Sequence, residues 1–143
     1  MIGPRSSLHD SWFLIGDILT GATLLEHPLV YPFGEITISG NGAIATVTDP
    51  SRALLWDSRQ TLDVFDLNSM THLKRFVQSL EGFECAGQVR FLPGDETVVS
   101  APGIRGWGPI QLINLKTMSV EKTSYLPNVE ADIGALAVGR RPQ

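Results

Sequence analysis

The chain has 143 residues, 43% of them hydrophobic and 18% charged, which predicts one folded domain and argues against a disordered chain. Its formal net charge of -4 argues against a nucleic-acid binder, because a positive surface is needed to displace the counterions of phosphates. The single cysteine, Cys85, excludes an internal disulfide and a multi-cysteine zinc site. Because 14 glycines and 9 prolines favour turns over long helices, we expect an all-β protein.

The amino-terminal region shows no recognisable targeting signal. Residues 1–10 lack the charged start, apolar centre and small-residue cleavage site of a secretory signal. The apolar runs at 12–15 and 22–25 are interrupted long before the ~20 residues that a membrane span needs. We therefore expect a cytoplasmic protein that does not enter a membrane.

Three segments align without gaps and recur at nearly equal intervals. Each has apolar residues at its first, third and sixth positions, a short polar residue at the fifth and a hydroxyl at the eighth. The segments begin at Phe13, Leu62 and Ile110, and their polar residues are Asp17, Asp66 and Asn114. These polar residues are separated by 49 and 48 positions. We expect each to end a strand and to accept hydrogen bonds from backbone N–H groups of the following turn.

A second pattern runs in phase with the first. Short alternating segments occur at 36–38, 89–91 and 136–138. The first two are followed by turn residues, at 40–42 and 93–95, and then by further apolar stretches, at 44–47 and 98–99. Alternation, a glycine-containing turn and a second β-branched run indicate a hairpin. Each period is therefore predicted to contain four strands.

Four short strands in a period of roughly 40 to 50 residues are typical of a β-propeller blade. Residues 64–69 and 112–117 resemble the end of the third strand and the turn in WD-repeat and related YVTN or quinoprotein-like propellers. Residues 91–95 resemble the turn after the innermost strand of such blades. The tryptophan of the WD dipeptide is replaced by Gly16, Phe65 and Ile113.

The predicted architecture is a β-propeller fragment with two complete four-stranded antiparallel blades plus partial flanking blades. Residues 1–34 end a preceding blade, residues 35–77 and 88–125 form the two blades, and residues 133–143 form the first strand of a following blade. A closed propeller needs about four to eight blades. The remaining blades therefore come from a longer polypeptide, from further copies in a homo-oligomer, or from a partner chain.

One segment has a competing helical pattern. Between Asn68 and Gly82, apolar residues follow the i, i+3, i+4, i+7 spacing of a helix, and both ends carry capping residues. The same segment occupies the place of an outer strand in the repeat. We predict a strand through about Val77, followed by a helical turn near residues 78–81.

Chemically active patterns are sparse. His9, His27 and His72 are far apart in the sequence without metal-ligand spacing, so we interpret them as surface histidines. No Gly-x-Ser-x-Gly motif is present, and the glycine-rich residues 103–108 precede a predicted strand rather than a phosphate-binding helix. Cys85 has no basic neighbour that would lower its pKa. We therefore predict no catalytic, cofactor-binding or metal-binding residue.

Two loops between the second and third strands of successive periods are rich in arginine and tryptophan, which dominate many protein interfaces. In propellers such loops share a face with those entering the innermost strand, here residues 81–84 and 128–132. The candidate partner-binding residues are Arg52, Trp56, Arg59, Phe83, Arg105 and Trp107.

The sequence therefore predicts a non-catalytic protein-interaction module of WD-repeat-like or YVTN-like propeller type. The alternative implied by the resemblance is a fragment of a propeller subunit of a quinoprotein or amine-dehydrogenase-like redox enzyme, in which the ring supports a redox partner.

Overall fold

A computed structural model describes residues 11–29, 35–49, 60–84, 87–102 and 109–125. All regular secondary structure in these ranges is β-strand, so the predicted all-β class is confirmed. The strands are β1 (Ser11–Gly16), β2 (Thr23–Leu29), β3 (Ile36–Ile38), β4 (Ile44–Asp49), β5 (Thr61–Asp66), β6 (Thr71–Val77), β7 (Gln88–Phe91), β8 (Thr97–Ala101), β9 (Ile110–Asn114) and β10 (Ser119–Ser124). The strand expected within 133–143 lies outside the described residues.

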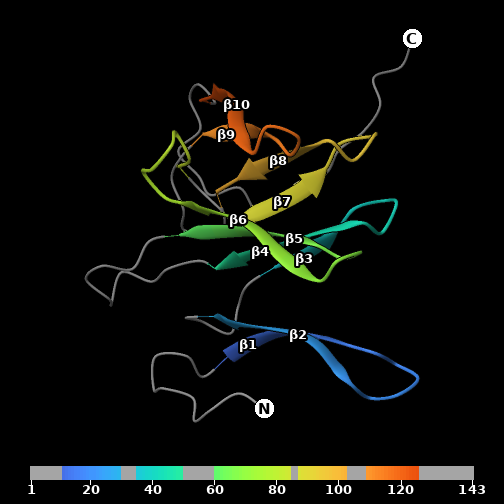
Figure 1. Ribbon diagram of the computed structural model, residues 1–143. Helices are drawn as coiled ribbons and strands as arrows, with labels where there is room; N and C mark the ends of the chain where they lie inside the picture. Colours follow the sequence, from blue (N-terminus) through green and yellow to red (C-terminus); the bar gives the residue numbers. More distant parts are fainter. Residues whose placement is uncertain (1–10, 30–34, 50–59, 85–86, 103–108, 126–143) are drawn as a thin grey trace.

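The strands form three antiparallel sheets. β1 pairs with β2, the second sheet has the order β3-β4-β5-β6, and the third has β7-β8-β9-β10. Each four-stranded sheet therefore connects its strands in chain order, and the predicted pair of four-stranded units is present. Figure 1 shows the sheets one above another, with β1–β2 at one end of the stack and β7–β10 at the other.

The middle sheet is covered on both faces, which explains why four consecutive residues of β5 are buried. Alternate side chains of a strand point to opposite faces. Leu62 and Val64 face the third sheet, whereas Phe65 faces β1–β2 and contacts Phe13, with 5.0 Å between ring centroids. A strand with both faces buried reads as a continuous apolar run, as 62–65 does apart from Asp63.

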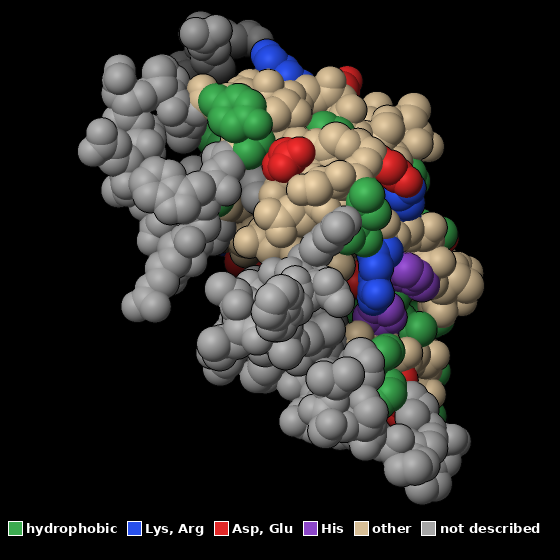
Figure 2. Space-filling model, turned by 90° about the vertical axis from the view of Figure 1, so that its left-hand side faces the viewer, with side chains coloured by type: hydrophobic (Ala, Val, Ile, Leu, Met, Phe, Trp, Pro, Cys, Tyr) green, Lys and Arg blue, Asp and Glu red, His purple; other side chains and the backbone are tan. Residues whose placement is uncertain are grey.

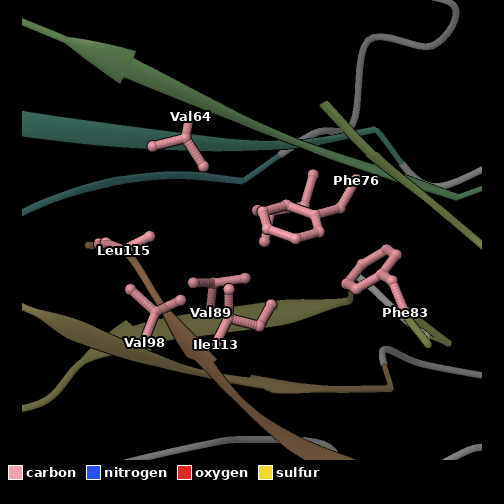
Figure 3. Close-up of a cluster of buried hydrophobic side chains, with 8 residues drawn as sticks. Val64, Phe76, Phe83, Val89, Val98, Ile113 and Leu115 are labelled. Atoms are coloured by element: carbon pink, nitrogen blue, oxygen red, sulfur yellow. The ribbon is translucent and has the colours of Figure 1, made fainter. Parts of the chain in front are cut away.

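The larger core lies between the two four-stranded sheets. Figure 3 shows Val64 and Phe76 of the middle sheet facing side chains of the third sheet, with Phe83 beside Phe76. The fully buried members are Leu62, Val64, Phe76, Phe83, Val89, Val98 and Ile113. Because the chain has no disulfide, this burial is the main source of its stability.

The three polar residues that close the aligned segments make the same turn contacts. Asp17 Oδ1 accepts hydrogen bonds from the backbone N–H groups two and three residues later, at 2.8 and 3.2 Å. Asp66 Oδ1 does so at 2.8 and 3.2 Å, and Asn114 Oδ1 at 2.8 and 3.1 Å. The expected hydrogen bonding is confirmed. β1, β5 and β9 therefore end in equivalent turns.

The segment with a helical pattern is a strand, as predicted. β6 pairs with β5 from Thr71 to Val77, and Phe76 is buried while Leu73 remains 43% exposed. The strand ends in tight turns, where the N–H of Leu80 donates to the Val77 carbonyl and Leu80 forms an isolated bridge with Phe83. Pairing with a buried strand thus outweighs the helical periodicity.

Candidate functional site

A cluster of four polar side chains lies between β1–β2 and the middle sheet. We call Asp63, His27, His72 and Arg75 the Asp63 cluster. Asp63 is fully buried, and its Oδ1 atom lies 2.7 Å from His72 Nε2 and accepts a hydrogen bond from Arg75 Nε at 2.9 Å. Its Oδ2 atom lies 3.3 Å from His27 Nε2. The cluster therefore joins β2 to β5 and β6 through one carboxylate.

The other side of the cluster reaches solvent. The side chains of His72 and Arg75 are 37% and 43% exposed, against 14% for His27. Figure 2 shows histidine and basic side chains next to one another on this face. The cluster is thus a surface feature anchored by a buried charge.

His27 gives the cluster two hydrogen-bonding arrangements. Its Nε2 atom lies 3.3 Å from Asp63 Oδ2 and 2.8 Å from Arg75 Nη2. One imidazole nitrogen cannot donate to the carboxylate and accept from the guanidinium at the same time. When Nε2 carries the proton, His27 donates to Asp63 and links β2 to β5. When Nε2 carries no proton, it accepts from Arg75 and links β2 to β6.

The charge of Asp63 is maintained despite its burial. Burial opposes ionisation, but hydrogen bonds from His27 and Arg75 and the positive charge of Arg75 outweigh it. The pKa of Asp63 is therefore lower than that of an ordinary aspartate.

His72 lies at the surface, as interpreted from the sequence, whereas the side chain of His27 is only 14% exposed. The sheets bring the two rings, which are far apart in the sequence, to 5.2 Å from one another. Sequence reasoning also missed Asp63. The available signal was a charged residue at the second position of its aligned segment, between the apolar residues Leu62 and Val64.

The second position of the third aligned segment is Gln111, which is also fully buried. Its amide donates to the Gly82 carbonyl at 2.7 Å and to Thr123 Oγ1 at 3.0 Å, and its Oε1 accepts from the N–H of Glu84 at 2.9 Å. Asp63 thus links β6 to β2, and Gln111 links β10 to the segment that precedes β7. Both residues satisfy polar groups between sheets, where an unpaired group would be costly.

A further polar contact joins β3 to β7. Glu35 Oε1 accepts hydrogen bonds from the N–H of Val89 at 3.1 Å and from Arg90 Nη1 at 2.5 Å. Thr37 donates its hydroxyl to the Val89 carbonyl at 3.1 Å. The first strands of the two four-stranded sheets are therefore tied directly to one another.

Asp95 clamps the turns that follow β3 and β7. Its carboxylate accepts hydrogen bonds from the N–H groups of Gly40, at 2.9 Å, and Asn41, at 3.0 Å. Asp95 has a φ of 60°, which aspartate and asparagine tolerate better than most residues. Asp95 therefore adopts a positive φ in the turn after β7 and holds the turn after β3 through its carboxylate.

Asp95→Ala is expected to lower the free energy of unfolding by about 1 to 2 kcal/mol, because it removes both hydrogen bonds and strains a positive φ. Asp95→Gly removes the same bonds without that strain, and Asp95→Asn retains an acceptor. Urea unfolding should rank the stabilities as wild type, then Asn, Gly and Ala. Equal stability of the Gly and Asn variants would contradict a role for the hydrogen bonds.

The predicted partner-binding residues have two different outcomes. Phe83 is fully buried and contacts Phe76, with 5.7 Å between ring centroids, so its expected place on a binding surface is corrected to a place in the core. The apolar ring fills the space between two sheets. The other five residues, Arg52, Trp56, Arg59, Arg105 and Trp107, lie outside the described residues.

Comparisons with protein-family models and with curated proteins found no match to the chain. Within the described residues, no group of three or more histidines, cysteines or acidic residues is arranged to hold a metal ion. The described part of the chain also contains no helix with the length and apolar character required to cross a membrane.

Proposed function

We propose that the chain is part of a β-propeller and acts as a non-catalytic protein-interaction module of WD-repeat-like or YVTN-like type. The observation that carries this proposal is the recurrence of one sheet unit. Two successive sheets have the same strand order, and three strands end in the same polar turn. Radial repetition of such sheets is the architecture of propellers.

The two loops rich in arginine and tryptophan connect equivalent strands. Residues 50–59 lie between β4 and β5, and residues 103–108 lie between β8 and β9. The two sheets pack face to face through their core and are joined at β3 and β7. Loops that leave equivalent strands of packed sheets can form one composite surface, and tryptophan and arginine are suited to anchor a protein there.

Simultaneous Trp56→Ala and Trp107→Ala substitution is expected to reduce capture of a protein partner from native extract at least about tenfold, as loss of interface anchors does. Ile18→Ala with Leu19→Ala is a matched control, because these exposed apolar residues lie in the turn after β1. The measurement is quantitative pull-down, with folding checked by circular dichroism. Equal capture by the loop variant and the wild type would contradict the proposal.

A further inference from the structure

The turn between β3 and β4 contains an asparagine followed directly by a glycine, Asn41-Gly42, and both residues are exposed. The backbone nitrogen of the residue after an asparagine can attack the side-chain amide carbon and close a five-membered succinimide ring. Glycine favours this attack because it has no Cβ that would obstruct the approach. A Cβ built on Gly42 would meet no described atom within 4 Å, so this peptide is also open to solvent.

The side chain of Asn41 bends over the Gly42 peptide. Asn41 Oδ1 accepts hydrogen bonds from the Ser39 hydroxyl at 2.7 Å and from the N–H of Ala43 at 3.0 Å. A backbone N–H only donates, so the atom that faces it is the amide oxygen rather than the amide nitrogen. Because Ala43 follows Gly42 directly, this bond holds the side chain beside the nitrogen that would attack it.

Both hydrogen bonds reach the atom that gains negative charge in the reaction. Attack on Asn41 Cγ converts the side-chain carbonyl into an oxyanion at Oδ1, and donors already aimed at such an oxygen stabilise the tetrahedral intermediate. Ser39 is itself held in place, because it is only 4% exposed and its Oγ accepts from the N–H groups of Ala43 and Ile44 at 3.1 and 3.0 Å. The hydroxyl donor is therefore preorganised.

One contact in the turn opposes the reaction. The N–H of Gly42 donates to the Ser39 carbonyl at 3.0 Å, and the nitrogen must lose this proton before it attacks. Gly42 is exposed, so water can replace this hydrogen bond at a small net cost. The contact therefore slows the attack without preventing it.

We propose that Asn41 is a site of self-catalysed deamidation, activated by Ser39 and Ala43. The Gly42 nitrogen loses its proton to water and bonds to Asn41 Cγ, while the bond from Cγ to Nδ2 breaks and the amide nitrogen takes up a proton and leaves as ammonia. A water molecule then opens the succinimide at either carbonyl. The product is aspartate or isoaspartate at position 41, each with a new carboxylate.

The new carboxylate would lie beside the clamp that Asp95 forms. The N–H groups of Gly40 and Asn41 donate to the Asp95 carboxylate at 2.9 and 3.0 Å. A negative charge on residue 41 repels Asp95 across this contact, and isoaspartate also lengthens the main chain of the turn by a methylene group. Deamidation therefore weakens the link between the turns that follow β3 and β7.

The test is incubation of the 143-residue chain at mildly alkaline pH, with the acid formed at each asparagine measured by peptide mass spectrometry. Acid should accumulate at Asn41 but not at Asn114, whose Oδ1 also accepts two backbone hydrogen bonds but whose next residue is Leu115. Ser39→Ala should slow the reaction at Asn41 at least about threefold, because it removes a donor to the oxyanion. Ser39→Cys keeps a similar shape with a weaker donor and should also slow it.

The direction of the Ser39 effect distinguishes activation from protection. If the turn only protected Asn41 through its rigidity, removal of the Ser39 hydroxyl would loosen the turn and accelerate deamidation. No acid at Asn41 in the wild type, or an unchanged or faster rate in the Ser39 variants, would overturn the proposal.

The effect on the clamp has its own test. Asn41→Asp reproduces the aspartate product and should lower the urea midpoint of the otherwise wild-type chain. The decrease should be smaller in an Asp95→Asn background, where no carboxylate opposes the new charge. Equal decreases in the two backgrounds would overturn the coupling between position 41 and Asp95.

Discussion

Phe83→Ala is expected to lower the free energy of unfolding by about 3 to 5 kcal/mol, the cost of removing a large aromatic side chain from a packed core. Phe83 is fully buried with its ring against Phe76, between β6 and the third sheet (Figure 3). The remaining cavity cannot collapse easily because paired strands on both sides fix its walls. Chemical denaturation followed by linear extrapolation measures the loss.

Leu80→Ala provides the matched control. Leu80 forms the bridge with Phe83 but is 48% exposed, so its truncation should change stability by no more than about 0.5 kcal/mol. A stable Phe83→Ala variant with weakened partner capture would reverse the assignment of Phe83 to the core and restore its role on a binding surface.

Asp63→Ala is expected to cost about 2 to 3 kcal/mol. The substitution removes the carboxylate that holds His27, His72 and Arg75 and that joins β2 to the middle sheet. Loss of one partner in a fully buried ion pair costs more. Here, His72 and Arg75 are partly exposed, so water replaces some of the lost hydrogen bonds.

Asp66→Asn is the control for this substitution. It removes an equal charge from the same strand but retains the turn acceptor, since asparagine already performs this role at Asn114. We expect its stability to lie within about 0.5 kcal/mol of the wild type. A similar loss in both variants would attribute the effect to net charge rather than to the Asp63 cluster.

The Asp63 cluster also predicts a pH dependence. The pKa of Asp63 is lower in the folded chain than in the unfolded chain, so the unfolded state binds more protons between the two values. The stabilisation is therefore fully present above the ordinary aspartate pKa of about 3.9 and is lost as the pH falls through the lower, folded-state value. The stability difference between the wild type and Asp63→Asn should be constant above about pH 5 and shrink below about pH 4. A constant difference down to pH 3 would contradict this coupling.

Local signals in the sequence were sufficient to predict the strands and their turns. Alternation predicted the β3 and β7 strands, and the positions of Asp17, Asp66 and Asn114 predicted hydrogen bonds that span only two or three residues. These features depend on nearby residues and on backbone geometry that any solvent-exposed turn shares. They could therefore be predicted without knowledge of the packing.

The Asp63 cluster and the place of Phe83 could not be predicted in this way. His27 and Asp63 are 36 residues apart, and Asp95 and Gly40 are 55 apart, so these contacts exist only when separate sheets pack. Phe83 lies in residues 81–84, which the repeat pattern predicted to be a loop on the binding face. The bridge between Leu80 and Phe83 instead directs the ring into the core.

The sequence by itself determined the all-β class, the four-strand units and the polar turns that end β1, β5 and β9, because each is encoded within a few neighbouring residues. Only the tertiary structure decided which apolar positions are buried. Ile36 and Val89 carry the same kind of side chain in equivalent strands, yet one is half exposed and the other is not exposed at all. Among the described residues, Ile36 faces a sheet of two strands and Val89 a sheet of four, and no local pattern contains that number.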